Sequence, residues 1–200
     1  MEKRSFIPGL LIAVALLQSI WCDTGGGGSP AVTYAIGDTG PAGGLIFYID
    51  EADAFSWTYL EVAPASTEWT NKDWGDYGTE IGGNAALTGI GDGQAATDAI
   101  VAHMEGESIT GTAAQLCDAL SYGSYADWFL PSKDELDAIW DNLVAAGTGS
   151  NNGVGGFAFD YYWSSSEYSS RYAWFQSFIT GYQYDTPKVN DLRVRAVRAF

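Results

Sequence analysis

Two cysteines and one histidine are the side chains with which nucleophilic or metal chemistry could be built in this chain of 200 residues. Cys117 lies at an apolar position of a short predicted helix, where a thiol behaves as a small hydrophobic group. His103 lies late in the preceding predicted helix and has no second histidine as a partner. We therefore expect Cys117 to be structural and His103 to be structural or solvated, and we assign no catalytic residue, no metal ligand and no cofactor.

Two turn-rich segments, residues 71–78 and 91–93, carry oxygen ligands that could hold Ca²⁺. Neither segment has the ligand spacing or the closing glutamate of an EF-hand. Ordinary Asx-turns, in which Asn and Asp side chains bond to nearby backbone, are typical of the same residues. Binding of a structural Ca²⁺ ion is therefore left as an open alternative, and we assign no ligand set to it.

The charge of the chain argues against one class of partner. Twenty-five Asp and Glu oppose nine Lys and Arg, and the net charge of −16 repels phosphate backbones, so we expect no nucleic acid partner. Hydrophobic residues make up 46% and aromatic residues 14%, which is enough for a sizeable core. The cations that gather near the C-terminus are Arg171, Lys188, Arg193, Arg195 and Arg198.

The elements that position these residues follow from hydrophobic periodicity. Residues 44–49 and 57–62 are rich in β-branched and aromatic residues and are bounded by turn residues, which predicts two strands. Residues 94–104 lack helix breakers and place apolar residues near helical spacing, and residues 113–120 form a second short helix or its continuation. The first half of the domain is thus predicted to mix strands and helices.

A capped helix is the clearest element. Ser132 is a predicted N-cap, Glu135 at the third helical position completes a capping box, and the helix ends at Gly147. An apolar stripe at helical spacing follows, with Trp140 as a principal core residue; its members are Leu136, Ile139, Trp140, Leu143 and Val144. We expect this stripe to face the core.

Three strands are predicted after the capped helix. They cover residues 161–166, 173–179 and 193–200, separated by polar loops. In the last segment arginines alternate with apolar residues, which predicts a half-exposed strand with its arginines outward.

The N-terminal segment indicates export. A basic start and an apolar run from Phe6 to Leu17 are typical of a signal peptide, which we assign to residues 1–21. Cys22 is the first residue of the glycine-rich segment 22–33. It resembles the lipid-modified cysteine of a bacterial lipoprotein, although bulky Trp21 precedes it. We expect lipidation at Cys22 and attachment to the outer surface of the bacterial envelope; an ordinary cleaved signal with Cys22 incidental is the alternative.

Four motifs resemble one bacterial family. They are residues 35–48 (AIGDTGPAGGLIFY), 125–136 (YADWFLPSKDEL), 162–167 (YWSSSE) and 193–200 (RVRAVRAF). Together they resemble the family with a formylglycine-generating-enzyme-like C-type lectin fold over residues 34–200. The resemblance implies an α+β domain with two main helices, a small mixed or antiparallel sheet, and paired N- and C-terminal strands. The family's enzymes depend on a pair of active-site cysteines, and Cys117 alone cannot supply it, so we expect no enzyme.

Within this domain, residues 161–200 resemble the variable region of proteins that retroelements diversify, as described in spirochaetal variable lipoproteins. In such proteins a mutagenic reverse transcriptase replaces template adenines, so that Asn codons change to codons for other residues. The resemblance implies an invariant frame of Trp174, Gln176, Phe178, Gly181, Gln183, Lys188 and Arg193. Diversified positions would lie between these frame residues.

The residues between the frame have the composition of an antibody paratope. Tyrosines are interleaved with small polar residues, a mixture that binds proteins with rigid rings and adaptable hydrogen bonds. The expected ligand-binding residues are Tyr168, Ser170, Arg171, Tyr172, Phe175, Ser177, Ile179, Thr180, Tyr182, Tyr184, Asp185, Thr186, Pro187, Val189, Asn190, Asp191 and Leu192.

These observations predict a monomeric, surface-anchored, non-catalytic protein that displays a diversified face to a macromolecular ligand. The sugar-binding motifs Glu-Pro-Asn and Trp-Asn-Asp of classical C-type lectins do not occur, which favours a protein ligand over a carbohydrate. A non-diversified adhesin or a structural surface lipoprotein of the same fold is the alternative.

Overall fold

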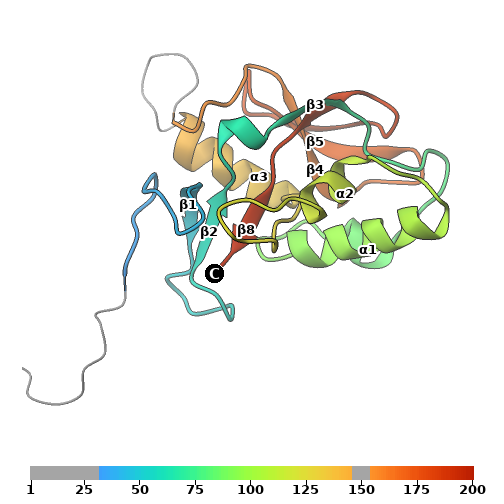
Figure 1. Ribbon diagram of the computed structural model, residues 1–200. Helices are drawn as coiled ribbons and strands as arrows, with labels where there is room; N and C mark the ends of the chain where they lie inside the picture. The colour runs from blue at the N-terminus through green and yellow to red at the C-terminus, as the bar shows by residue number, and fades with distance from the viewer. Residues whose placement is uncertain (1–31, 146–153) are drawn as a thin grey trace, which may run out of the picture. The chain divides into compact units, whose positions relative to one another are not determined.

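A three-stranded sheet joins the two ends of the domain. The computed structural model describes residues 32–145 and 154–200, and residues Thr33–Phe200 form one compact unit (Figure 1). Strands β1 (Leu45–Ile49), β2 (Tyr59–Val62) and β8 (Val197–Ala199) are antiparallel in the order β1-β2-β8. The N- and C-terminal strands therefore share one sheet, as the resemblance implied, but they do not pair directly, because β2 lies between them and pairs with both.

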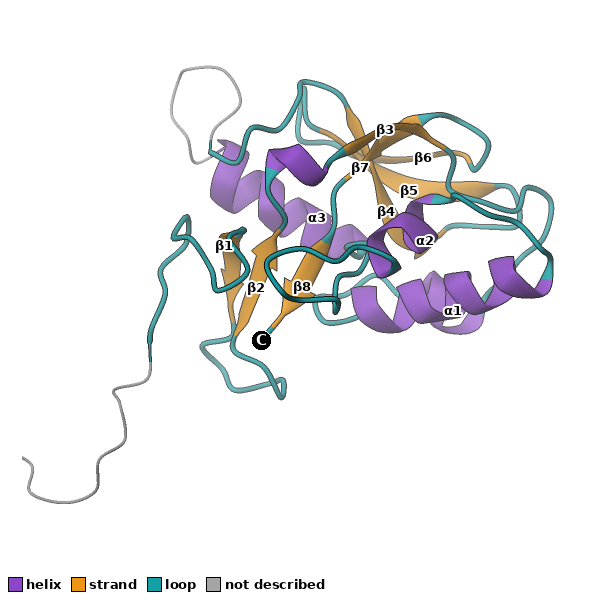
Figure 2. Cartoon of the chain, viewed as in Figure 1, coloured by secondary structure: helices purple, strands orange, loops and turns teal. Residues whose placement is uncertain are grey.

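A second sheet of five strands carries most of the C-terminal region (Figure 2). Its order is β3 (Trp69–Lys72), β7 (Leu192–Val194), β4 (Tyr161–Glu167), β5 (Tyr172–Ser177) and β6 (Gln183–Pro187). The β4–β7 pair is parallel and the other pairs are antiparallel. The sequence did not predict β3 or β6, because both are short and mostly polar.

The helices confirm the predicted pattern. They are α1 (Gly93–Gly106), α2 (Ala113–Asp118) and α3 (Lys133–Ile139), with short 3₁₀ turns at Ala65–Thr67 and Gly83–Ala86. The capping box at α3 is present: the Ser132 hydroxyl accepts from the Glu135 N–H at 3.2 Å, and Glu135 accepts from the Ser132 N–H at 2.7 Å. Together with the two sheets, these elements give the α+β, C-type-lectin-type fold.

Two hydrophobic clusters form the core. The first lies around α1 and α2 and includes Trp74, Trp128 and Trp163. The second lies around α3 and the three-stranded sheet and includes Phe178 with the apolar stripe residues Leu136, Ile139, Leu143 and Val144. The predicted orientation of the α3 stripe is confirmed for these four residues, because each is at most 7% exposed.

Trp140 departs from its predicted role. The α-helix ends at Ile139, and Trp140–Ala145 continue as a π-helix. Trp140 is half-buried at the edge of the second cluster, where its ring meets Phe178 edge-on at 5.7 Å. The predicted helix end at Gly147 lies outside the described residues.

The last predicted strand is wrong in two respects. Residues 193–200 divide between β7 and β8, which belong to different sheets. Arg195 and Arg198 are not outward but only 1% and 4% exposed, because buried or partly buried carboxylates pair with them. Strict alternation cannot distinguish a solvated arginine from one that meets an internal partner.

The N-terminal predictions concern residues beyond the described ranges. The signal peptide 1–21, the lipidation site Cys22 and almost all of segment 22–33 fall in this part of the chain. Within residues 32–145 and 154–200, no helix is long and apolar enough to cross a bilayer.

Candidate binding surface

Strands β5 and β6 form a hairpin whose two faces have different surroundings. Phe175 pairs with Tyr184, and the next pair along the hairpin is Gln176 with Gln183. Because successive side chains point to opposite faces, the Phe175 pair and the Gln176 pair lie on opposite sides of the sheet. The register thus places Phe175 and Tyr184 on one face and the frame glutamines on the other.

The frame glutamines bind α3. Gln176 is fully buried and donates from Nε2 to Asp137 Oδ1 at 2.9 Å and to the Gly181 carbonyl at 2.7 Å. Gln183 donates from Nε2 to the Lys133 carbonyl at 2.6 Å. These side chains hold the hairpin to the scaffold.

Lys188, another frame residue, is completely buried. Its Nζ donates to Glu167 Oε1 at 2.6 Å and to the Thr79 carbonyl at 2.9 Å. It also lies 4.7 Å from the ring centroid of Trp74. Glu167 in turn accepts from the backbone N–H groups of Ile81 and Gly82, so the pair joins β6, β4 and the loop before α1.

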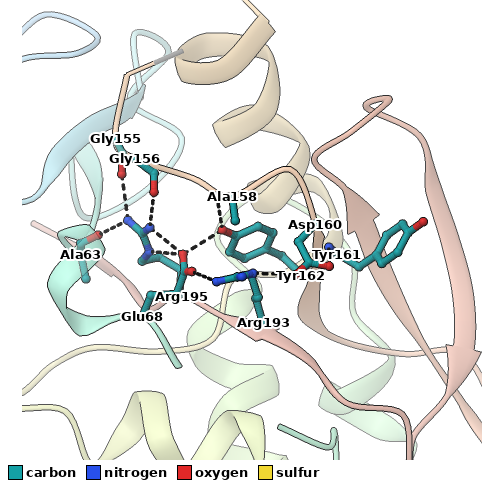
Figure 3. A network of polar contacts seen from close by, with 10 residues as sticks. All are labelled: Ala63, Glu68, Gly155, Gly156, Ala158, Asp160, Tyr161, Tyr162, Arg193 and Arg195. Carbon is teal, nitrogen blue, oxygen red and sulfur yellow. Dashed lines mark hydrogen bonds and ion pairs between the residues drawn. The ribbon is translucent and has the colours of Figure 1, made fainter. Parts of the chain in front are cut away.

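Arg193 enters a network that is centred on Glu68 (Figure 3). Arg193 donates to Glu68 at 2.6 Å and to Asp160 at 2.8 Å, and Arg195 donates to Glu68 at 2.6 Å. The Tyr162 hydroxyl also donates to Glu68, and its burial beside that carboxylate raises the pKa of Tyr162. The hydrogen bonds to Asp160 and Glu68 raise the pKa of Arg193, so its guanidinium stays charged.

The turn between β5 and β6 rests on Trp140. Gly181 has φ +81°, and an added Cβ there would collide with the Trp140 indole, so glycine is required on both grounds. Phe178 is 1% exposed and packs beside Trp140 and Phe157. The remaining frame residue, Trp174, is half-buried, with Lys133 Nζ 5.0 Å from its ring centroid. All seven frame residues thus contact the scaffold.

The opposite face of the hairpin is open at one end. A concavity of about 470 Å³ lies there, which we call the aromatic concavity; its lining residues are Tyr161, Phe175, Ser177, Ile179, Thr180, Tyr182 and Tyr184. Tyr182 and Tyr184 are 65% and 54% exposed. Phe175 meets Tyr161 edge-on at 5.4 Å and lies 6.1 Å from Tyr184, so the rings form one continuous apolar surface.

Tyr161 belongs to this surface but was not among the expected binding residues. It precedes buried Tyr162 on β4, and Figure 3 shows Tyr162 directed into the Glu68 network and Tyr161 directed away from it. The pairing of Tyr161 with Ser177 places it beside β5. Alternation along β4 could have suggested its exposure, but only the strand order shows that it joins the concavity.

A second group of expected binding residues lies at the other end of β5. Tyr172 pairs with Pro187, and the Lys188 N–H donates to the Arg171 carbonyl at 2.9 Å, so the two neighbouring turns meet there. The exposed or partly exposed residues of this group are Tyr168, Ser170, Arg171, Tyr172, Thr186, Pro187, Val189, Asn190 and Asp191. The fold therefore distributes the expected residues over two ends of the hairpin, with exposed Asp185 between them.

Two expected binding residues are part of the scaffold as well. Ser177 is 3% exposed, and its hydroxyl accepts from the Ile179 and Thr180 N–H groups, which stabilises the turn. Leu192 is half-buried and packs against the first core cluster, so only part of its side chain is open to a ligand. Both residues lie among the tyrosines in the sequence. The tertiary contacts that bury them cannot be read from the mixture of tyrosines and small polar residues.

The residues with reactive side chains have structural surroundings. Cys117 is buried, and burial raises its pKa well above the usual value, which keeps the thiol protonated. His103 Nε2 lies 3.0 Å from Asp76 Oδ2, and this hydrogen bond lowers the pKa of Asp76. His103 is therefore held by a hydrogen bond to Asp76, an arrangement that fits a structural role.

The two candidate Ca²⁺ loops use their carboxylates internally. Asp92 accepts from the Gly89 N–H at 2.7 Å, and Asp76 is occupied by His103. Burial, and then the nearby charge of Asp191, raise the pKa of Asp73. Among residues 32–145 and 154–200, no three His, Cys, Asp or Glu side chains are grouped to hold a metal ion.

The fold and this surface define an α+β domain of C-type-lectin type that displays aromatic side chains from one hairpin. The chain belongs to the family of the Lcl C-terminal domain, whose model matches residues 49–198. This membership supports a place among variable, ligand-binding surface proteins. A search of the curated proteins found no match to the chain.

Proposed function

We propose that the chain is a non-catalytic, lipid-anchored surface protein that presents a retroelement-diversified face to a protein ligand. The observation that carries this proposal is the division of residues on β5 and β6. Frame residues bind the scaffold through their side chains, whereas Tyr182, Tyr184 and their neighbours are exposed and make few contacts. Such a division lets the exposed residues change while the backbone stays in place.

The surroundings of the reactive residues support the absence of catalysis. The buried Cys117 thiol is protonated, and His103 is paired with Asp76. Neither group borders the aromatic concavity, whose lining holds no carboxylate, histidine, lysine or cysteine. Binding by shape and aromatic contact is the activity that such a lining supports.

The partner and the location follow from the same proposal. The aromatic concavity with hydroxyl groups at its rim suits a protein surface. Net charge −16 opposes nucleic acid, and acylated Cys22 would hold a monomer on the outer surface of the envelope.

Sequencing the gene and its surroundings tests the proposal. We expect a reverse transcriptase nearby and a near-copy of the 3′ coding region with adenines at the codons for the exposed positions. Copies of the gene should differ at Tyr172, Tyr182 and Tyr184 and keep Gln176 and Lys188. Copies that vary evenly along the domain, without a template repeat, would favour the non-diversified adhesin.

A further inference from the structure

Four of the five cations near the C-terminus, all but exposed Arg171, pair with carboxylates of the domain. Lys188 pairs with Glu167, Arg195 with Glu68, and Arg198 with Glu61 at 2.7 Å. The guanidinium groups of Arg193 and Arg198 also bind Asp160 and Asp127. Four of the seven described lysines and arginines are therefore neutralised by carboxylates of the scaffold.

The other described cations lie away from the aromatic concavity. Lys133 is beside Asp134 at 3.6 Å and lies over Trp174, and Arg171 lies 5.9 Å from the centroid of Tyr77. Lys72 belongs to β3, at the opposite edge of the sheet from β6. The concavity is thus uncharged itself. Asp185 follows Tyr184 but points to the opposite face of the hairpin, and the carboxylate of Asp160 is bound by Arg193.

We propose that the aromatic concavity binds a lysine or arginine side chain of a basic protein surface, with arginine preferred. The faces of tyrosine rings attract cations, and a planar guanidinium also stacks on them. An uncharged aromatic site would accept an apolar side chain too, but net charge −16 draws a cationic partner. This inference rests on the proposed binding function and specifies its ligand.

The domain already uses this interaction inside its own fold. The Arg198 guanidinium lies 3.9 Å from the ring centroid of Tyr125, and Lys188 lies 4.7 Å from that of Trp74. In each case a carboxylate stands on another side of the cation. The concavity offers an incoming cation rings of the same kind, with Tyr182 and Tyr184 6.3 Å apart between their centroids.

Three blocked tripeptides test the ligand chemistry. Acetyl-Gly-Arg-Gly-amide carries the cation, and its citrulline and norleucine analogues keep the length without the charge. Each is titrated into the full-length chain in neutral detergent, and NMR follows the ¹³C-labelled tyrosine rings, assigned by single Tyr→Phe variants. We expect the arginine peptide to shift the Tyr182 and Tyr184 signals with a Kd at least fivefold below that of either analogue.

Matched variants locate the site. Tyr182→Leu with Tyr184→Leu should weaken arginine binding at least fivefold, because leucine keeps the apolar area but has no aromatic face. Tyr182→Phe with Tyr184→Phe should retain binding, because phenylalanine keeps the aromatic face. Tyr168→Leu should retain it too, since Tyr168 is 56% exposed but lies outside the concavity. Raising the NaCl concentration from 50 to 500 mM should weaken binding of the arginine peptide but not of its two uncharged analogues.

The cation site would be overturned if the citrulline and norleucine peptides bound as tightly as the arginine peptide. It would also be overturned if Tyr182→Leu with Tyr184→Leu left binding of the arginine peptide unchanged. The proposed function is judged separately, by variation among gene copies. Variation confined to the exposed positions, together with equal binding of the three peptides, would leave the displayed face standing and remove only its preference for cations.

Discussion

Single buried charges decide how the variable region is held. Lys188 and Glu167 are both almost completely buried, and each has further hydrogen bonds to backbone groups. A buried ion pair adds little net stability over an apolar pair, but loss of one partner leaves an uncompensated charge. Lys188 therefore acts as a positioning residue for the end of β6.

Lys188→Met should lower the free energy of unfolding by about 3–5 kcal/mol, because Glu167 would stay buried without its cation. Denaturant titration measures the loss. The matched control is Lys133→Met, which removes a partly exposed lysine and should cost less than about 1 kcal/mol. Equal midpoints for the Lys188 variant and the parent would show that Glu167 reaches water.

Glu135 makes stability depend on pH. Burial raises its pKa from 4.5 to about 7, despite hydrogen bonds from backbone N–H groups at Ser132 and Gly91. The folded state therefore holds the proton between the unfolded and folded pKa values, where the unfolded state has released it. The contribution of Glu135 to stability is largest below pH 4.5 and declines as pH rises to about 7.

The difference in unfolding free energy between the parent and Glu135→Gln isolates this titration from other groups. This difference should fall by about 3 kcal/mol between pH 4.5 and 7 and should stay constant above pH 7. Urea titrations at half-unit pH steps measure it. A difference that rises with pH over this range would mean that the carboxylate is the favoured buried form.

At the scale of elements, the cap of α3 stabilises two segments. The Ser132 hydroxyl accepts from the Glu135 N–H and donates to the Gly89 carbonyl at 2.7 Å. Ser132→Ala should cost about 1–2 kcal/mol, because the helix start and the loop before α1 both lose a partner. Thermal unfolding checks this, with Ser169→Ala, on a half-buried turn, as a control near zero.

The β5–β6 hairpin should tolerate changes at its exposed positions only. Tyr172, Tyr182 and Tyr184 are exposed, so their joint replacement by Ser should move the free energy of unfolding by less than about 0.5 kcal/mol per site. Phe178→Ser should cost about 3–5 kcal/mol, since the ring packs against Phe157 and Tyr162. Chemical denaturation compares the two. Unfolding of the triple variant would place the tyrosines in the core and remove the basis of the proposed face.

At the scale of the whole molecule, attachment of the domain is expected to depend on Cys22. Two acyl chains and an N-acyl group hold a protein on a membrane more firmly than one chain does. Cys22→Ala should release the protein into the aqueous phase of a detergent partition, whereas Cys117→Ala should not. Equal release of Cys22→Ala and parent would contradict lipidation.

The features that the sequence determined are local. Ser132 and Glu135 lie three residues apart, so their types alone predict the capping box and the start of α3. Periodicity over a few residues likewise identified β1, β2, α1, α2 and β4. The frame of Gln176, Gln183 and Lys188 was found through the family resemblance, and each residue does contact the scaffold.

Only the tertiary structure shows which charged and aromatic side chains are buried in the domain. Arg198 meets Glu61 across 137 positions and Arg195 meets Glu68 across 127, and no local pattern reveals such partners. The order of β4, β5 and β6 brings Tyr161, Phe175 and Tyr184 together, although Tyr161 and Tyr184 are far apart in the chain. A residue's type fixes what it can bind, but burial and strand order determine whether that group faces the core or a ligand, because both depend on contacts distant in sequence.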